Sequence, residues 1–164
     1  MKITEVKQDL FTVPKDYALV HCISADFAMG AGIAKEFTRR GVKDFIHKKY
    51  TALTKPLPVI GISIQTFATD WVCEFNLVTK HKYWQKPTYV KLEQSLIDMK
   101  ERISRSNEMR EELVKEYGLQ KPLITKLAMP KIGCGLDKLQ YDKVKTIIED
   151  VFADTDIEIL VCSI

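Results

Sequence analysis

Two glycine-rich segments hold the residues best suited to bind an anion. The first, Met-Gly-Ala-Gly-Ile-Ala at residues 29–34, follows an apolar stretch, and the second, residues 130–137, follows another. Glycines leave backbone N–H groups open, and a glycine loop that starts a helix binds phosphate because the helix dipole favours negative charge there. Together the two segments could hold a diphosphate from two sides.

Neither segment satisfies a standard nucleotide motif. The dinucleotide fingerprint needs glycine or alanine where Lys35 stands, and the Gly-Lys-Ser/Thr of a Walker A loop does not occur. For one such loop, a tight strand-to-helix turn without a ligand is an equal alternative. Two loops that each follow a strand favour a ligand.

Two ionisable residues could do chemistry. Asp137 ends the second loop, where it is either a carboxylate beside a phosphate or the N-cap of the next helix. Lys80 ends a predicted strand, where a lysine is usually a solvated surface charge. It becomes a nucleophile only as the free amine, which burial or neighbouring cations favour. The sequence leaves these alternatives open.

Other polar residues predict less. His21 and Cys22 are neighbours in a predicted strand, so they point to opposite faces and cannot form a nucleophile and base pair. The histidines and cysteines have no metal-ligand spacing, so we expect no metal site and reduced thiols. Ser24 either caps its strand or donates into a pocket. Asp9 is either a turn residue or an acceptor for an exocyclic amine.

The hydrophobic pattern predicts strands that alternate with helices. Apolar runs indicate buried strands, and apolar residues at three- and four-residue steps indicate helices. This order predicts an α/β fold with helices on both faces of a largely parallel sheet, whose ligands bind beyond the carboxyl ends of the strands. We expect disorder only near residues 104–110. The predicted strands are 2–7, 17–23, 59–67, 71–78 (the last two as a hairpin-like pair), 123–129 and 157–164, and the predicted helices are 33–41, 42–50, 88–103, 108–117 and 141–152.

The composition describes an ordinary globular chain. Its 164 residues fit a single domain, 1–164, and the formal charge of +3 is spread along the sequence. This dispersion argues against a protein that coats a polyanion but permits a local anionic ligand. We find no signal-peptide pattern or membrane span, so we expect a cytoplasmic protein without a membrane partner.

Several motifs together resemble the macrodomain family, and most closely its terminal ADP-ribose glycohydrolase branch. They are Gln-Asp-Leu-Phe at 8–11, His-Cys-Ile-Ser at 21–24, the two glycine segments, Thr-Lys at 79–80 and Lys-Pro-Thr-Tyr at 86–89. The similarity runs in register from Ile3 to Ile164. It departs at Gln8, where the family usually has glycine.

The resemblance implies a three-layer α/β/α macrodomain, with a mixed, largely parallel central sheet and a cleft for ADP-ribose. By the same resemblance Asp9 would recognise the adenine amine, with the Leu10 backbone nearby, and Ser24 would line the pocket. Lys80 and Asp137 would be the catalytic pair. The residues that would surround the diphosphate and the distal ribose are Met29, Gly30, Ala31, Gly32, Ile33 and Ala34 in the first loop and Ile132, Gly133, Cys134, Gly135 and Leu136 in the second.

The implied activity is hydrolysis of ADP-ribose from acidic side chains of proteins, and of O-acetyl-ADP-ribose, through a lysyl intermediate without cofactor or metal. Two alternatives remain open. Relatives in this branch act on ADP-ribosylated DNA bases, as antitoxins, and many macrodomains only bind ADP-ribose without hydrolysing it. The expected partners are therefore ADP-ribose and ADP-ribosylated protein, with ADP-ribosylated nucleic acid as the alternative, and we expect a monomer.

Overall fold

A six-stranded sheet organises the chain in the computed structural model, which describes residues 1–50, 59–118 and 123–164. The strand order is β1-β6-β5-β2-β4-β3, and each neighbouring pair is parallel except β3 and β4. The predicted hairpin-like pair is therefore confirmed as the antiparallel edge of a mixed sheet. The strands are β1 (Lys2–Lys7), β2 (Ala18–Ser24), β3 (Ile62–Thr66), β4 (Glu74–Lys80), β5 (Lys126–Met129) and β6 (Glu158–Ser163).

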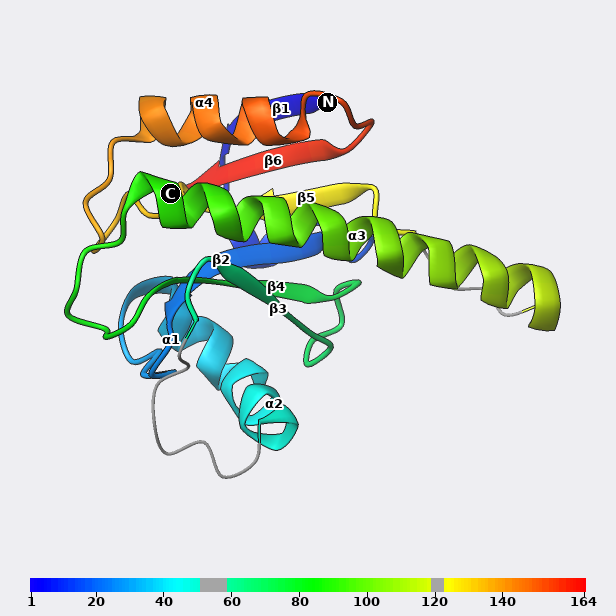
Figure 1. Ribbon diagram of the computed structural model, residues 1–164, viewed down its shortest axis with the longest axis horizontal. Coiled ribbons are helices and arrows are strands. Elements are labelled where there is room, and N and C mark those ends of the chain that lie inside the picture. Colours follow the sequence, from blue (N-terminus) through cyan, green and yellow to red (C-terminus); the bar gives the residue numbers. More distant parts are fainter. Residues whose placement is uncertain (51–58, 119–122) are drawn as a thin grey trace.

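Helices cover both faces of this sheet (Figure 1). α3 (Tyr89–Tyr117) and α4 (Tyr141–Phe152) pack on one face, while α1 (Gly32–Arg39) and α2 (Val42–Lys49) pack on the other. A short 3-10 helix, η1 (Leu10–Thr12), follows β1. Side chains of β2 alternate between the two faces of the sheet and contribute to a hydrophobic core on each face. Ala18 and Val20 face α3 and α4, whereas Leu19 and Ile23 face α1 and α2. The predicted α/β/α layering is confirmed.

One helix replaces the two that we predicted between residues 88 and 117. α3 runs without interruption, from an N-cap at Thr88 to Gly118, which closes the helix in the left-handed conformation at φ +66. The predicted disorder near 104–110 is wrong, because this segment is helical and rich in helix-forming residues. Asn107 also fixes it by donating to the carbonyl of Ile124 and accepting from its N–H.

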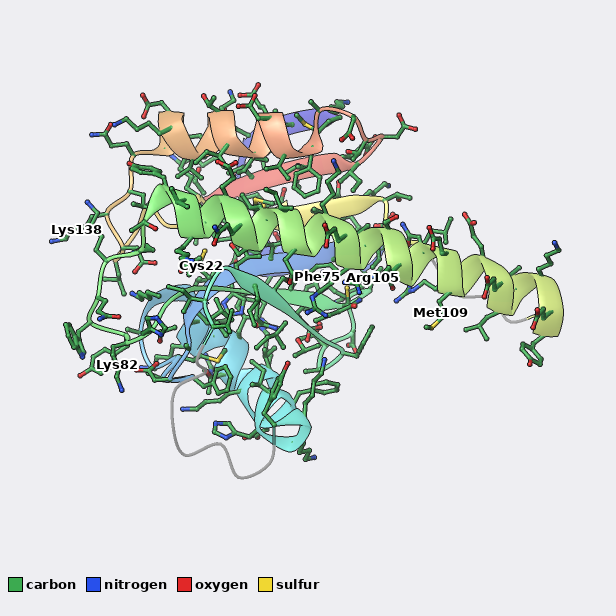
Figure 2. All side chains as sticks on the ribbon, viewed as in Figure 1. Cys22, Phe75, Lys82, Arg105, Met109 and Lys138 are labelled. Atoms are coloured by element: carbon green, nitrogen blue, oxygen red, sulfur yellow. The ribbon has the colours of Figure 1, made fainter. Side chains whose placement is uncertain are left out.

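The core supports only the first half of α3. Its buried positions end at Ile103, and the rest of the helix projects beyond the sheet, where Figure 2 shows Met109. The helix starts at the edge of the sheet where β4 ends, so its projecting half points away from that edge. In the described part of the chain no helix combines the length and apolarity needed to cross a membrane.

Candidate active site

Three neighbouring strands end together at one edge of the sheet. β5, β2 and β4 lie side by side and run parallel, so the segments that follow them emerge at the same edge. The first glycine segment follows β2, the second follows β5, and Lys80 is the last residue of β4. The topology thus gathers predicted site residues from three distant parts of the sequence.

The first loop leads into the N-terminus of α1. The helix begins at Gly32, whose φ of +59 suits glycine. Its N-cap is Ala31, which has no side chain to cap the first turn, so the N–H groups of that turn are available to an anion. The hydroxyl of Thr38 donates to the carbonyl of Met29 at 3.0 Å and fixes the loop against its own helix.

The second loop is a tight turn built around Gly133. This residue has φ +73, and its carbonyl accepts from the N–H of Leu139 at 2.7 Å. A Cβ at this position would lie 2.7 Å from Leu139 Cδ1, so both the backbone and the packing require glycine. Ile132 is buried and anchors the start of the turn. The loop therefore keeps a defined shape beside the cleft.

The two loops touch each other through one side chain. Leu136 is mostly exposed, at 71%, but its Cδ1 atom lies 3.2 Å from the position that a Cβ of Gly32 would occupy. The missing side chain of Gly32 therefore makes room for Leu136. The loops form two walls that meet at this contact.

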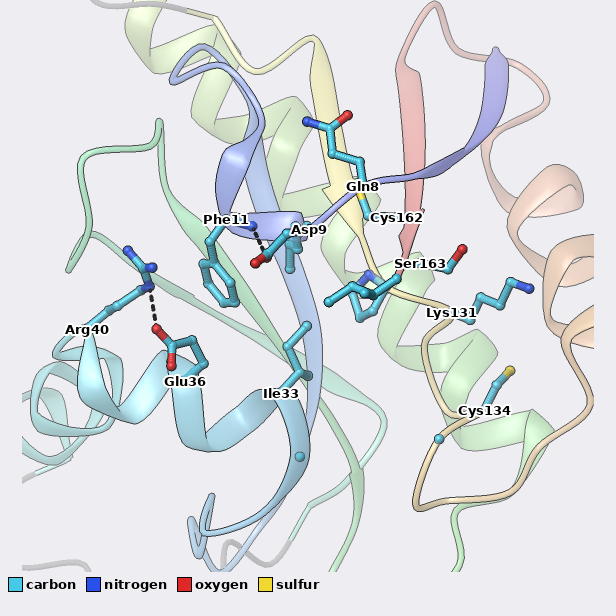
Figure 3. A pocket seen from close by; sticks show the side chains of 15 residues that line it. Gln8, Asp9, Phe11, Ile33, Glu36, Arg40, Lys131, Cys134, Cys162 and Ser163 are labelled. Atoms are coloured by element: carbon cyan, nitrogen blue, oxygen red, sulfur yellow. Dashed lines mark hydrogen bonds and ion pairs between the residues drawn. The ribbon is translucent and has the colours of Figure 1, made fainter.

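A cavity of about 710 Å³ opens beside these walls (Figure 3). Its volume is in the range typical of small-molecule sites. Asp9 stands in its lining, where Oδ1 accepts from the N–H of Phe11 at 2.9 Å and caps η1. Asp9 is thus a turn residue and a cavity residue at once. The lining consists of Gln8, Asp9, Leu10, Phe11, Gly32, Ile33, Glu36, Arg40, Pro130, Lys131, Cys134, Gly135, Cys162, Ser163 and Ile164.

Sequence reasoning missed one wall of this cavity. The guanidinium carbon of Arg40 lies 4.4 Å from the ring centre of Phe11, and Arg40 Nε donates to Glu36 Oε1 at 3.2 Å. Glu36 and Arg40 follow Ile33 at three- and four-residue steps, so all three share one helix face. That spacing was visible in the sequence. What the sequence did not show is that this face borders the cavity.

Lys80 and Asp137 meet as a largely buried ion pair. Lys80 Nζ donates to Asp137 Oδ1 at 2.5 Å, and the side chains are only 11% and 14% exposed. The surface position that we considered for Lys80 is wrong. The helix-cap alternative for Asp137 is also wrong, because α4 has Gln140 at its N-cap. Neither member of the pair lines the cavity. Gly135, two residues before Asp137 in the second loop, does line it.

The thiol nearest the pair is not a rival nucleophile. Cys22 lies close enough to the pair to be influenced by both of its charges. Burial above all, then the negative charge of Asp137, raises the pKa of Cys22 far above its ordinary value. Cys22 therefore stays a neutral thiol at physiological pH, and the only amine and carboxylate in contact here are Lys80 and Asp137, as far as the described residues show.

His21 points to the other face of β2, so the structure confirms that it forms no pair with Cys22. Its ring stacks on Phe37 of α1 with centres 3.8 Å apart, and Nε2 bonds to Asn76 Oδ1 at 2.5 Å. Burial lowers the pKa of His21 to about 4, against the opposing hydrogen bond from Asn76. A neutral imidazole thus helps to seat α1. Ser24, which we predicted to line the pocket, donates its hydroxyl to Asp26.

Comparison with known proteins gives a consistent result. The chain is 38% identical to ADP-ribose glycohydrolase OARD1 of Bos taurus and 37% identical to that of Homo sapiens, in both cases over 162 residues, 98% of this chain and 90% of the relative. No family model matches the chain.

Solved structures agree at the level of the fold. The macrodomain of Mycobacterium tuberculosis DarG superposes with a TM-score of 0.75 at 21% identity, over 99% of this chain and 97% of that one. Thermosipho africanus DarTG, solved in complex with ADP-ribose, gives a TM-score of 0.64 at 16% identity over 99% of this chain and 42% of that one. The sheet, the paired glycine loops and the full-length similarity lead to one conclusion: the chain belongs to the macrodomain family, in its ADP-ribose glycohydrolase branch.

Proposed function

We propose that this ADP-ribose hydrolase removes mono-ADP-ribose from glutamate and aspartate side chains of proteins and also cleaves O-acetyl-ADP-ribose. The observation that carries the proposal is the buried Lys80–Asp137 pair at the end of the second glycine loop. The relatives named ADP-ribose glycohydrolase support the reaction class. We further propose that the protein acts as a cytoplasmic monomer with one macrodomain over residues 1–164.

The cleft offers a separate place for each part of ADP-ribose. Asp9 in the cavity would accept from the adenine amine. The open N–H groups at the start of α1 and the backbone of the second loop would hold the diphosphate between them. Such positioning can lower a barrier by about 7–11 kcal/mol when it aligns the reacting atoms. The distal ribose would then lie at Lys80 and Asp137.

The reaction begins with transfer of a proton from Lys80 to Asp137 along their hydrogen bond. The free amine attacks the anomeric carbon of the distal ribose, a nitrogen–carbon bond forms, and the carbon–oxygen bond to the substrate carboxylate breaks. The carboxylate leaves with the electron pair and takes up the proton that Asp137 had received, so Asp137 is again ionised. Asp137 next takes a proton from water, which attacks the same carbon, and Lys80 departs and is reprotonated. ADP-ribose and the free acid are the products.

The same scheme covers the acetylated metabolite. When the acetyl group is on the anomeric oxygen, acetate is a carboxylate leaving group of the same kind as a glutamate side chain. The low exposure of Lys80 and Asp137 suits this chemistry, because a site shielded from water strengthens the electrostatic interactions of its groups.

The decisive experiment is intact-mass analysis during turnover of a glutamate-linked ADP-ribosyl peptide. The wild-type protein should show a covalent ADP-ribosyl adduct that Lys80→Ala lacks, together with loss of hydrolysis. Lys86→Ala, which removes an exposed lysine from the segment that follows, is the matched control and should behave as wild type. Undiminished hydrolysis by Lys80→Ala would refute the proposed mechanism. Binding of ADP-ribose without any hydrolysis by the wild-type protein would instead identify a reader.

One observation favours a second substrate, ADP-ribosylated nucleic acid. Tyr83 and Trp84 follow Lys80 closely and are 66% and 69% exposed, next to Lys82 and Lys86. Exposed aromatic rings beside lysines suit stacking on unpaired bases and contact with phosphates. Figure 2 shows Lys82 at the end of the molecule where β4 terminates.

A side-by-side assay separates the two substrates. ADP-ribosylated single-stranded DNA and the ADP-ribosyl peptide would be offered to the wild-type protein and to Trp84→Ala. If DNA is a substrate, Trp84→Ala should weaken its turnover selectively, and the binding of DNA should fall steeply with salt. Equal effects of Trp84→Ala on both substrates would count against a nucleic-acid role.

A further inference from the structure

The pairing of β2 with β4 changes register just before Lys80. Ile23 pairs with Val78, but Ser24 pairs with Lys80, so Thr79 is an extra residue in β4. An extra residue of this kind redirects the side chains that follow it, since strand residues alternate between the two faces. Such irregularities are common next to active sites.

This shift decides which face Lys80 uses. Ile23 and Val78 both belong to the core on the α1 and α2 side. Without the extra residue, Lys80 would follow Val78 onto that side. With the extra residue, Lys80 points to the same face as its partner Ser24, which is the face of Cys22. The charges of Lys80 and Asp137 both act on the Cys22 thiol, which agrees with this placement. The register shift therefore brings Lys80 to Asp137.

Backbone hydrogen bonds extend the pairing beyond the two strands. The N–H of Ala25 donates to the carbonyl of Lys80 at 2.8 Å, and the N–H of Asp26 donates to the carbonyl of His81 at 3.2 Å. The start of the first loop and the turn after Lys80 are thus joined residue by residue. These two bonds continue the shifted pairing beyond the ends of the strands.

The carboxylate of Asp26 completes this junction. Oδ1 accepts from the hydroxyl of Ser24 at 2.5 Å and from the N–H of Ala28 at 3.1 Å, and Oδ2 accepts from the N–H of Tyr83 at 3.1 Å. Ala28 leads into the first glycine loop, whereas Tyr83 lies in the turn after Lys80. One side chain therefore connects the end of β2, the phosphate loop and the segment that carries the lysine.

We propose that Asp26 is a positioning residue that holds Lys80 on the Asp137 side of the sheet and in fixed relation to the first glycine loop. The proposal rests on the function proposed above for Lys80 and adds a residue to which neither the family motifs nor the cavity assigned a role. Asp26 itself does not need to touch the substrate. Its three accepted hydrogen bonds make the position of Lys80 depend on the loop that binds the ligand.

The ionisation of Asp26 is compatible with this role. Burial acts to raise the pKa of Asp26, but the hydrogen bonds from Ser24, Ala28 and Tyr83, with the charge of Lys82, hold it below the ordinary value of a carboxyl group. A lowered pKa keeps the carboxylate charged above its usual titration range. The junction therefore keeps a charged acceptor at neutral pH.

Asp26→Asn is the sharpest variant. Its carbonyl oxygen can still accept from Ser24 and Ala28, but its NH₂ group would face the N–H of Tyr83, so only the link to the lysine segment is lost. Misplacement of a reacting group by about 1 Å can cost about 100-fold in rate. We expect single-turnover hydrolysis of the ADP-ribosyl peptide to slow by about 10- to 100-fold, whereas the dissociation constant for ADP-ribose changes by less than about threefold.

Two NMR readouts make the test independent of catalysis. In Asp26→Asn, the amide proton of Tyr83 should exchange faster with solvent, and the side-chain signal of Lys80 should move toward that of an unpaired lysine. Asp154→Asn removes an exposed carboxylate in the turn after α4 and is the control. If the Lys80 signal and the single-turnover rate both stay at wild-type values, Asp26 does not position Lys80.

The remaining outcomes are also decisive. A weakened affinity for ADP-ribose that accounts for the whole loss of rate would show that Asp26 serves ligand binding only, and would overturn the proposal. Continued hydrolysis by Lys80→Ala would refute the function proposed for Lys80. Even then, the NMR signal of Lys80 would test the link between Asp26 and Lys80 separately. A signal in Asp26→Asn that matches the wild-type signal would reject this link, and a shifted signal would support it.

Discussion

The Lys80–Asp137 pair should show strong energetic coupling, because removal of either partner leaves the other charge largely buried. At 2.5 Å and an effective dielectric constant of about 20, the Coulomb attraction is about 7 kcal/mol before desolvation is counted. Desolvation offsets most of this energy, and loss of one member of a buried pair typically costs about 3–5 kcal/mol. Since both side chains keep slight exposure, we expect about 2–3 kcal/mol for each single variant.

A double-mutant cycle measures the coupling. Lys80→Met, Asp137→Ala and the double variant would be unfolded in urea beside the wild-type protein at pH 7. The double variant should lose about 2–3 kcal/mol less than the summed losses of the single variants, because no unpaired charge remains. The exposed pair of Lys145 and Glu5, at 3.1 Å, is the matched control and should couple by at most about 1 kcal/mol.

Additivity within about 0.5 kcal/mol would refute the reasoning, because it would mean that each charge is solvated well enough to stand alone. The expected result has a functional meaning. A double variant that is no less stable than either single variant but is inactive would show that the paired charges are needed for chemistry beyond their part in folding.

Three further predictions concern the scaffold and the ligand. Burial lowers the pKa of His21 from 6.5 to about 4. The His21 contribution to the free energy of unfolding should therefore be fully present above pH 6.5 and fall by about 3 kcal/mol between pH 6.5 and 4, as the unfolded state takes up the proton. His21→Gln should remove this part of the pH dependence, and an unchanged pH profile in that variant would contradict the prediction. Gly133→Ala should lower the free energy of unfolding by at least about 1–2 kcal/mol, and with it the melting temperature, because Gly133 has a positive φ and the Leu139 side chain is close. Gly135→Ala, which has open space at its Cβ position, should lower the free energy of unfolding by less than about 0.5 kcal/mol. Asp9→Ala should weaken ADP-ribose binding about tenfold by calorimetry through loss of a charged hydrogen-bond acceptor, and unchanged affinity would exclude Asp9 from adenine recognition.

Local signals explain why much of the fold could be predicted. The apolar runs that became β2 and β5 and the glycines that follow them are contiguous in the sequence, so strand, loop and helix could be placed from neighbouring residues alone. The α/β/α layering follows from the same alternation. The break that we predicted inside α3 failed because Asn107 bonds to Ile124, which is distant in sequence and cannot be inferred from helix periodicity.

The chemistry of the site depends on contacts that no local pattern reports. Lys80 is buried because β4 gains one residue against β2, and a register shift belongs to the pairing of two strands rather than to either sequence. The role of Asp137 could not be separated from helix capping until the start of α4 was known. The cavity wall from the end of β6 was equally hidden, since Cys162 and Ser163 read as ordinary strand residues.

The two halves of the long helix α3 should differ in their stability against local unfolding. Its 29 residues span about 44 Å, and its buried positions end at Ile103, with Asn107 bonded to the backbone of Ile124 one turn further on. The last turns have no fully buried residue and should open more readily than the rest of the helix, which hydrogen exchange would record as a gradient of protection along one helix. Because this end points away from the cleft, it is a suitable place to attach a fluorophore or a fusion partner without disturbing the Lys80–Asp137 pair.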